Sequence, residues 1–418
     1  MARVLLLLPS GTYRAPDFLA AARRLGVDVV VGSDRRQAMS AAMGDRALVV
    51  VLRRPEEAAA RIVALAARTP LDAVVAVDDQ GVEAAALASR ALGLRANPPE
   101  AVRAARDKRL MREALEEAGV PQPRFRVAGP CDDVAALART LGPPCVVKPV
   151  GLSGSRGVIR ADTPDAVAAA AVRVRAIQSE AGEDPDRALL VEEFVPGREV
   201  AVEGLLREGQ LELLAVFDKP DPLDGPYFEE TIYVTPSRLP AGVLAGVEAR
   251  TAEAAKALGL VEGPVHAELR FDGPRVRVLE LAARSIGGLC GRSLRFGLGV
   301  SLEELVLRHA LGRPLDGLRR EAAASGVMML PIPAAGTLVG VEGQEAARAV
   351  PGIVGLELSI RPGRPVRPLP DGDRYLGFLF ARGERPADVE AALREAHARL
   401  RVAVVDSGAE APVPMTVG

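Results

Sequence analysis

The sequence predicts a mixed α/β protein, α+β overall, in which a small parallel sheet precedes antiparallel sheets. Within the first 97 residues, short apolar runs alternate with amphipathic segments, as in βαβ units. From Glu199 the pattern changes to long alternating strands such as EVAVEGLLREGQLELLAVF, which are typical of antiparallel sheets. The stretch from about Gly326 is rich in Gly, Pro and Val, so we expect a separate small α+β unit there.

Length and composition narrow the class of protein. The 418 residues are enough for two to four domains, and a net charge of -2 provides no broad basic field for nucleic acid. The three cysteines lie far apart without CxxC spacing, which favours a reducing cytoplasm over a disulfide framework or zinc site. The first apolar run, Val4–Leu8, is short, and no stretch is long enough to cross a membrane. We expect a cytoplasmic protein that binds neither nucleic acid nor membrane.

The first domain, residues 1–98, is predicted to be a small open parallel sheet. Its expected strands are Val4–Leu8, Val27–Val31, Ala47–Leu52 and Ala73–Val77, and its expected helices are Ala15–Leu25, Glu56–Arg68 and Gly81–Leu92. Loops after such strands usually face a ligand, so Asp79 is a candidate substrate residue. Asn97-Pro-Pro breaks the pattern and ends this domain.

Three further domains are expected after this break. Residues 99–198 should begin with a helix over Pro99–Gly119 and continue with strands at Phe125–Val127, Cys145–Pro149, Gly157–Arg160 and Leu189–Phe194 and helices at Asp132–Leu141 and Thr163–Ala181. Residues 199–325 should contain a hairpin over His266–Leu281 and helices at Gly246–Leu258 and Ser301–Leu311. Residues 326–418 form the last domain, with a helix at Pro386–Leu400.

Lysine is scarce in this chain. Of its 53 Lys and Arg residues only four are Lys, namely Lys108, Lys148, Lys219 and Lys256. Because Arg serves elsewhere as the surface cation, a position that remains Lys can require a compact ammonium. Lys148 ends an apolar strand, where a charge is costly unless an anion meets it.

A loop rich in glycine and serine, GLSGSRG at residues 151–157, follows the strand that ends near Lys148. Glycines allow backbone N–H groups to crowd around phosphate oxygens, and hydroxyls add donors. The chain contains no Gly-Lys pair, so this is not a Walker A loop. A flexible hairpin turn is the alternative, and the neighbouring Lys148 favours the phosphate site.

Two later segments carry acidic residues. In LVEEFVPGRE, residues 190–199, a strand enters a Pro-Gly bend, where exposed main chain can bind an adenine edge and an acid can hold ribose hydroxyls; an interdomain linker is the alternative. In the hairpin over His266–Leu281, a three-residue loop, Gly273–Arg275, would set Glu268 opposite Glu280. Facing carboxylates repel unless a cation lies between them, and their oxygens suit Mg²⁺. A solvent-facing hairpin is the alternative.

The order of these motifs resembles the ATP-grasp superfamily over roughly residues 1–310. The residues that carry the resemblance are Asp107-Lys108, Val-Val-Lys148-Pro, the Gly/Ser loop, Glu192-Glu193-Phe194-Val195-Pro-Gly-x-Glu199, Glu268 and Glu280-x-x-x-Arg284. Within that superfamily, His266-x-Glu268 and Leu-Glu280-Leu-Ala-Ala-Arg284-x-x-Gly287-Gly288 are similar to the L-amino-acid ligases, which make dipeptides. The resemblance implies an ATP-grasp fold with an N-terminal parallel-sheet domain, a lid, an antiparallel core and a small C-terminal domain.

The resemblance also implies roles. ATP phosphates would be held by Lys108, Lys148 and a closing loop that includes Ser153, Gly154, Ser155 and Gly157. Adenine would bind along Glu192, Glu193, Phe194 and Val195, and ribose at Glu199. Mg²⁺, or Mn²⁺, would bind Glu268 and Glu280, while Arg284 and Lys148 would act on the phosphorylated intermediate. Lys219 is either a third lysine facing ATP or part of a surface turn.

The implied substrates are a small carboxylate and an amine, with amino acids favoured, and a homodimer is possible. Candidate substrate residues are Asp79, Tyr233, His266, Arg284, Gly287 and Gly288, although core packing is the alternative for Phe228 and Tyr233. Ala282 stands where many ATP-grasp enzymes have Asn, which weakens a match to the carboxylase and purine-ligase branches and leaves the metal fewer ligands. The alternatives are a ligase for a γ-glutamyl or other non-amino-acid carboxylate, a biotin-carboxylase-like enzyme, and a nucleotide-binding regulator without catalysis.

Overall fold

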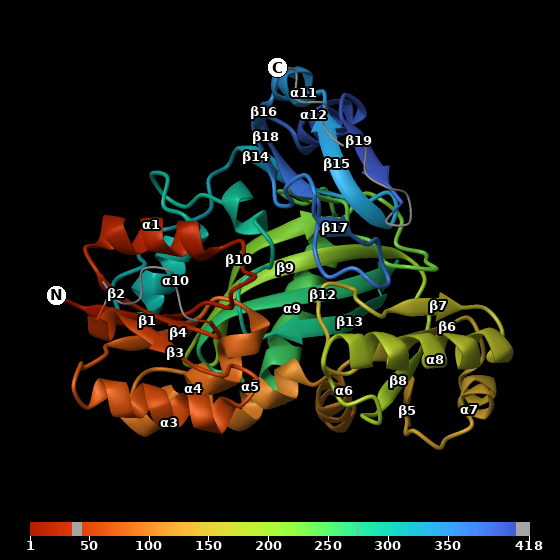
Figure 1. The fold of residues 1–418 in the computed structure, drawn as a ribbon, viewed down its shortest axis with the longest axis horizontal. Helices are drawn as coiled ribbons and strands as arrows, with labels where there is room; N and C mark the ends of the chain where they lie inside the picture. The colour runs from red at the N-terminus through yellow and green to blue at the C-terminus, as the bar shows by residue number, and fades with distance from the viewer. Residues whose placement is uncertain (36–43, 274, 407–418) are drawn as a thin grey trace, which may run out of the picture.

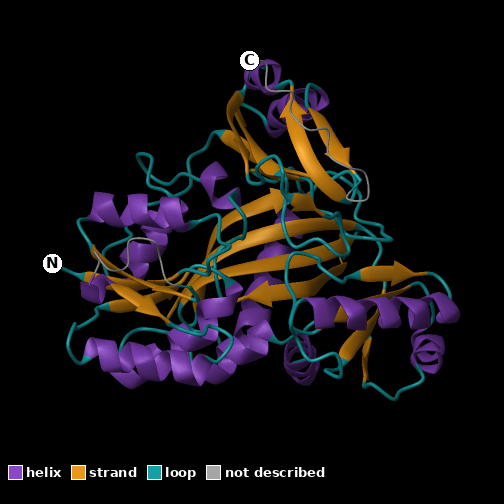
Figure 2. Cartoon of the chain, in the orientation of Figure 1, coloured by secondary structure: helices purple, strands orange, loops and turns teal. Residues whose placement is uncertain are grey.

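The computed structural model describes residues 1–35, 44–273 and 275–406, which are organised around four sheets (Figure 1). The N-terminal sheet lies on one side of a large central sheet, and a smaller sheet with its two helices lies on the other (Figures 1 and 2). The C-terminal strands and helices lie above the central sheet in this view. Among the described residues, none of the helices has the length and apolar character needed to span a bilayer.

The N-terminal sheet is parallel, as predicted, with the strand order β3-β2-β1-β4. Its strands are β1 (Arg3–Leu7), β2 (Asp28–Ser33), β3 (Ala47–Val49) and β4 (Ala73–Ala76), and its helices are α1 (Ala15–Leu25), α3 (Pro55–Ala66) and α4 (Val82–Leu92). The short 3-10 helix η1 (Gly44–Arg46) precedes β3, and the short 3-10 helix η2 (Asp79–Gly81) follows β4. Because parallel strands end at one edge, Asp79 lies at the edge that faces the central sheet.

The prediction of a single helix over residues 99–119 is wrong, because the helix is interrupted at Asp107. Two helices, α5 (Pro99–Arg106) and α6 (Lys108–Glu117), meet at this residue, which has extended backbone angles. Its carboxylate accepts hydrogen bonds from the backbone N–H groups of Arg109 (2.9 Å) and Leu110 (3.2 Å), as an N-cap does. The break places Lys108 in the first turn of α6, where its backbone N–H donates to the Val150 carbonyl (2.9 Å).

The second sheet carries the glycine loop. Its antiparallel strands follow the order β5-β8-β6-β7, and two helices cover one face. These elements are β5 (Phe125–Ala128), β6 (Cys145–Pro149), β7 (Ile159–Ala161), β8 (Leu189–Glu193), α7 (Val134–Leu141) and α8 (Pro164–Glu180). Every strand and helix predicted here is present within two residues of its expected bounds. We call this unit, residues 120–193, the lid subdomain.

The central sheet has eight strands in the order β13-β12-β9-β10-β11-β14-β18-β16. They are β9 (Arg198–Arg207), β10 (Gln210–Asp218), β11 (Ile232–Thr235), β12 (Gly263–Asp272), β13 (Arg275–Ala282), β14 (Ala324–Leu330), β16 (Ile353–Leu358) and β18 (Gly377–Gly383). The helices packed around it are α9 (Ala241–Ala257), α10 (Leu302–Ala310) and α12 (Pro386–Ala398), and the 3-10 helix η3 is Cys290–Ser293.

The C-terminal residues are less separate from the core than the sequence suggested. The expected boundary at residues 325 and 326 falls inside β14, which pairs with β11 on one side and β18 on the other. Glycine at position 326 permits this contact, since a Cβ there would lie 2.8 Å from the Tyr233 carbonyl oxygen. A small additional sheet, β17-β15-β19, and one short helix complete this part, with β15 (Gly336–Glu342), β17 (Pro365–Val366), β19 (Arg401–Val405) and α11 (Gln344–Arg348).

The β12–β13 hairpin places Glu268 opposite Glu280, as predicted, but by a different route. Asp272 pairs with Arg275, so the loop holds two residues and not the three that we expected. A two-residue loop alone would offset the two glutamates. A β-bulge corrects the offset, because Leu279 is an extra residue between the pairs Leu269–Val278 and Glu268–Glu280. The bulge could not be read from residue spacing.

Candidate functional site

A cavity of about 1020 Å³ lies between the N-terminal sheet, the lid subdomain and the central sheet. The structure brings nearly all of the predicted site residues to this one cavity. Those that line it are Asp79, Lys108, Lys148, Ser153, Gly154, Ser155, Glu192, Glu193, Phe194, Val195, Glu199, Tyr233, His266, Glu268, Glu280, Arg284, Gly287 and Gly288. Gly157 and Lys219 are not among the residues that line the cavity. The lining also includes residues that the sequence analysis did not select, among them Glu230, Arg270 and Tyr375.

Lys148 ends strand β6 as a buried cation paired with a buried acid. Its Nζ lies 2.6 Å from Oε2 of Glu192, which is on the neighbouring strand β8. Burial lowers the pKa of Lys148, and the charge of Glu192 opposes this shift. Burial alone would raise the pKa of Glu192, but Arg112 and Lys148 together hold that pKa below its ordinary value. The predicted adenine residue Glu192 thus directs its carboxylate to the lysine.

Arg112 of helix α6 is the second partner of Glu192, and its side chain is fully buried. Its Nε lies 2.7 Å from Glu192 Oε1, and its Nη2 donates to the carbonyl oxygen of Leu279 (2.5 Å). Leu279 is the extra residue of the β-bulge, whose carbonyl is left out of the regular ladder. The Arg112 guanidinium therefore joins the lid subdomain and helix α6 to the β12–β13 hairpin, which carries Glu268 and Glu280.

Lys108 contacts both the glycine loop and the hairpin. Its Nζ donates to the Leu152 carbonyl (2.6 Å) and lies 3.2 Å from Glu280 Oε1. Burial alone would raise the pKa of Glu280, but Lys108 and Lys148 hold it below its ordinary value. The loop itself has left-handed backbone angles at Gly154 and Ser155, which turn it back over the cavity.

The Gly157 end of this loop is fixed from outside the lid subdomain. Its backbone N–H donates to the carbonyl of Pro370, in the segment between β17 and β18 (2.9 Å). Arg367 of the same segment pairs with Glu180 of helix α8 (2.8 Å), and Asp371 pairs with Arg173. The C-terminal residues thus hold the far side of the lid subdomain.

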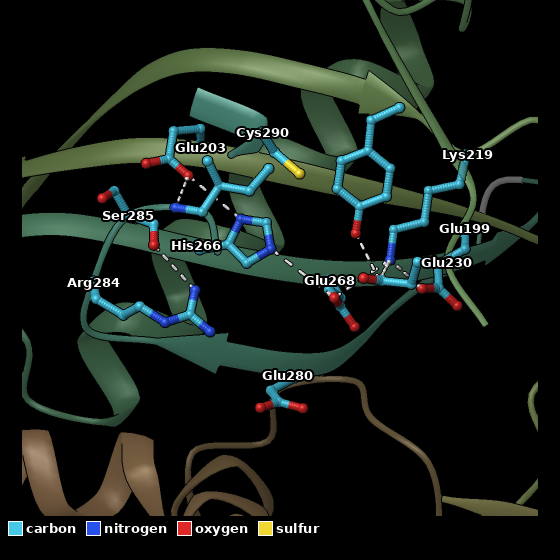
Figure 3. A network of polar contacts seen from close by, with 12 residues as sticks. Glu199, Glu203, Lys219, Glu230, His266, Glu268, Glu280, Arg284, Ser285 and Cys290 are labelled. Atoms are coloured by element: carbon cyan, nitrogen blue, oxygen red, sulfur yellow. Dashed lines mark hydrogen bonds and ion pairs between the residues drawn. The ribbon is translucent and has the colours of Figure 1, made fainter. Parts of the chain in front are cut away.

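Lys219 is buried, so the surface-turn interpretation is wrong. Its Nζ lies 2.7 Å from Glu199, 2.5 Å from Glu230 and 3.3 Å from Glu268. Figure 3 shows the Lys219 side chain beside Glu199 and Glu230. Burial alone would lower the pKa of Lys219, but these three carboxylates raise it well above its ordinary value. Tyr233 adds a hydrogen bond from its hydroxyl to Glu230 (2.6 Å). The lysine is held by acids rather than exposed to solvent.

The same acids form a candidate metal centre. Glu199, Glu230 and Glu268 each place a carboxylate oxygen within 4.8 Å of the others, and Glu280 lies across the hairpin from Glu268. Burial raises the pKa of Glu268 well above its ordinary value; Lys219 opposes this shift, and Glu230, Glu199 and Glu280 add to it. A divalent cation would remove that repulsion, and hard carboxylate oxygens suit Mg²⁺. The donor set therefore fits the metal that the sequence analysis expected.

The predicted adenine segment packs an aromatic pair against arginines. Phe194 and Phe228 are stacked with ring centroids 6.4 Å apart, and the Arg160 guanidinium lies 4.2 Å from the Phe194 centroid. Arg270 donates to the Val195 carbonyl (2.7 Å) and pairs with Glu199 (2.8 Å), the predicted ribose acid. Phe228 faces the cavity rather than the core, whereas Tyr233 is fully buried with only its hydroxyl directed to the acids.

Glu193, the remaining acid of this segment, directs its carboxylate to two arginines. It pairs with Arg124 (2.7 Å) at the lid surface and lies 3.5 Å from Arg277.

Arg284 and Asp79 form a two-bond ion pair across the cavity. Both hydrogen bonds, from Nε and Nη2 to the two carboxylate oxygens, measure 3.0 Å. Burial alone would raise the pKa of Asp79, but Arg284 holds it well below its ordinary value. The predicted catalytic arginine and the predicted substrate acid therefore contact each other, although one lies after β13 and the other after β4.

The other substrate candidates lie beside this pair. His266 is buried between two acids, with Nδ1 3.4 Å from Glu203 and Nε2 3.9 Å from Glu268 (Figure 3). A Cβ on Gly287 would meet no atom within 4 Å, whereas one on Gly288 would lie 2.9 Å from the Phe378 ring. Gly287 therefore borders open space in the cavity, and Gly288 permits close packing.

Sequence reasoning missed Arg112, Glu230 and Arg270. Arg112 and Arg270 are two arginines in an arginine-rich chain, so their type gave no signal. Their burial gives the signal, since each is at most 2% exposed, and a buried guanidinium requires several acceptors. Glu230 lies between Phe228 and Tyr233, which the sequence analysis did name.

Family models match three parts of the chain: the ATP-grasp N-terminal domain at residues 19–95, the ATP-grasp domain at residues 141–293, and the L-amino acid ligase C-terminal domain 2 at residues 328–405. Among solved structures, an L-amino acid ligase from Bacillus licheniformis superposes with a TM-score of 0.79 at 23% identity, covering 97% of this chain and 99% of that one. At that identity the likeness concerns the fold.

Curated relatives match a smaller share of this chain than that solved structure does. The uncharacterized protein y4rH of Sinorhizobium fredii is 26% identical over 294 residues, which cover 68% of this chain and 58% of that protein. Alanine–anticapsin ligase of Bacillus subtilis is 26% identical over 231 residues, covering 51% of this chain and 48% of the ligase. The chain thus spans about half the length of these curated relatives.

Replacing Arg112 by Met should destabilise the protein by about 3 kcal/mol, because Glu192 remains buried after losing one of its two cations. Urea unfolding at neutral pH measures the change. Arg124→Met is the matched control, since Arg124 pairs with an acid of the same strand but its side chain is 62% exposed. That variant should lose less than about 1 kcal/mol. Equal losses in the two variants would contradict the role given to Arg112.

The Asp79–Arg284 pair should make stability depend on acid pH. Because the folded pKa of Asp79 lies below its unfolded value of about 4, the stabilisation is complete above that pH and is lost as the pH falls. Asp79→Asn should therefore cost about 2 kcal/mol at pH 7 and progressively less below pH 4. Urea unfolding from pH 7 to pH 3 tests this, with exposed Asp224→Asn as the control. A constant cost across that range would refute the assignment.

Proposed function

Because this chain belongs to the ATP-grasp superfamily, we propose that it is an ADP-forming ligase that activates a carboxylate with ATP and joins it to an amine. The observation that carries the proposal is the meeting of Lys108, Lys148, Glu268, Glu280 and Arg284 in one cavity, beneath a glycine loop. We further propose that both substrates are amino acids and that the product is a dipeptide. The match of residues 328–405 to an L-amino acid ligase domain supports this finer assignment.

Charge exchange explains how the cavity would take up a nucleotide. Lys108 is paired with Glu280, and Lys148 is paired with Glu192. Phosphate oxygens would give the two lysines new anionic partners, which would leave Glu280 free as a metal ligand beside Glu268. A Mg²⁺ ion bound there would supply neutralising charge for the phosphates. Glycine-loop N–H groups near Ser153 and Ser155 would add donors.

The chemistry would proceed in two steps. An oxygen of the carboxylate substrate attacks the γ-phosphorus of ATP, and ADP leaves. The amine then attacks the acyl carbon, so that a C–N bond forms, the C–O bond to phosphate breaks and the amine loses a proton. Arg284 and Lys148 would stabilise the negative charge that develops on the transferred group. The lid subdomain and its glycine loop would exclude water from the intermediate.

A phosphate-release assay with each amino acid, alone and in pairs, tests the assignment. We expect release with ATP and Mg²⁺ only when two amino acids are present, and a dipeptide of matching mass as the product. Release with a single carboxylate and a simple amine would instead indicate a broader carboxylate–amine ligase. If no amine or carboxylate stimulates release while ATP still binds, the chain is a nucleotide-binding regulator and the proposal is wrong.

Lys148→Met should reduce phosphate release by about 10² or more, because one fixed cation facing the transferred group is lost. Lys256→Met is the matched control, because Lys256 is exposed on helix α9 and does not line the cavity. It should retain wild-type activity. Full ADP production by the Lys148 variant, in protein that unfolds as the wild type does, would exclude the assigned role.

A further inference from the structure

Arg14 is a buried arginine that the proposed chemistry does not use. It is 2% exposed and follows the loop that leaves the carboxyl end of strand β1, at the start of helix α1. Its Nη1 donates to the Val77 carbonyl (2.8 Å), and its Nη2 donates to the Ser285 hydroxyl (2.6 Å). A second contact from Nη1 reaches the Ser285 carbonyl (3.4 Å). One planar fork therefore binds two chain segments 208 residues apart in sequence.

These two segments carry the ion pair at the centre of the cavity. Val77 comes two residues before Asp79, and Ser285 comes directly after Arg284. Asp79 follows strand β4 of the N-terminal sheet, whereas Arg284 follows the last strand of the hairpin in the central sheet. The separation between their backbones thus depends on how these two sheets are held together, and Arg14 bonds to both sides of that junction.

The far side of the same segment is also fixed. The Ile286 N–H donates to Oε2 of Glu203 (2.9 Å), and Glu203 is a fully buried residue of strand β9. Arg284 itself returns a hydrogen bond from Nη1 to the Ser285 carbonyl (3.1 Å). The segment from Arg284 to Ile286 is therefore held between a buried cation, Arg14, and a buried anion, Glu203.

We propose that Arg14 is a positioning residue, which sets the place of the Arg284 guanidinium by bonding to the backbone on either side of the Asp79–Arg284 pair. This inference rests on the proposed function, in which Arg284 faces the transferred phosphoryl group. A displacement of about 1 Å at such a group can cost about 10² in rate. Lysine cannot replace the fork, because a single ammonium cannot hold Val77 and Ser285 in the planar geometry of a guanidinium.

The test compares Arg14 with another arginine at the same junction. Arg313 donates from Nη1 to the carbonyl of Leu25 (2.9 Å), the last residue of helix α1, so it also joins a later segment to the N-terminal domain, but it does not line the cavity. Arg14→Lys and Arg14→Met should lower kcat by about 10-fold and 10²-fold, with KM for ATP within about twofold of wild type. Arg313→Met should leave both constants within about twofold. Equal effects at the two arginines, or a change in KM alone, would overturn the proposal.

A double-mutant cycle separates positioning from general stability. If Arg14 acts through the ion pair, Arg14→Lys should cost little further kcat in an Asp79→Asn background, so the two losses are not additive. Additive losses would overturn the proposal. If the wild type releases no phosphate with any substrates, the proposed function fails, and the cycle is then read from urea midpoints, which need no substrate. If the urea midpoint of the double variant shifts by less than the sum of the two single-variant shifts, the positioning role is supported. If it shifts by the full sum, that role is refuted.

Discussion

The buried contact between Arg112 and Glu192 is the constraint on which the rest of the cavity depends. Glu192 has two cationic partners: Arg112 contacts both of its carboxylate oxygens, Oε1 at 2.7 Å and Oε2 at 3.4 Å, and Lys148 lies 2.6 Å from Oε2 at the end of strand β6. The same guanidinium binds the Leu279 carbonyl that the β-bulge exposes, and the bulge is what sets Glu268 opposite Glu280. Lys148 and the facing pair Glu268 and Glu280 are thereby placed by one side chain.

Three buried lysines at the cavity are each paired with acids of the protein. Lysines 108, 148 and 219 meet Glu280, Glu192 and a group of three acids respectively. Burial of an unpaired charge is too costly for such a site to exist without these internal partners. A nucleotide and its cation would bring the same two kinds of charge in one ligand, so binding would exchange partners rather than bury new charges. This explains how a stable fold can keep a strongly charged interior ready for a polyanion.

Periodicity and turn residues predicted most elements, because those signals are local. The parallel N-terminal strands and the elements of the lid subdomain lie close to their expected positions. The helix break at Asp107 was missed although its sequence shows an N-cap residue, since the apolar pattern continues through it. The boundary near residue 326 was placed by composition, whereas strand pairing across β14 carries the central sheet into the C-terminal residues. Composition cannot report hydrogen bonds between strands 90 residues apart.

By itself, the sequence determined which chemical groups this protein brings to its cavity. Scarce lysines, a glycine loop, alternating acids and an arginine after the second acid are all local in the chain. Only the tertiary structure decided their partners: Asp79 for Arg284, Glu192 for Lys148, three acids for Lys219, and buried Arg14 at the junction of two sheets. The physical reason is that the strength of an interaction between two charges depends on how deeply they are buried and on the distance between them. Both arise when segments that are distant in the sequence pack together, as Arg24 and Glu304 also do across 280 residues.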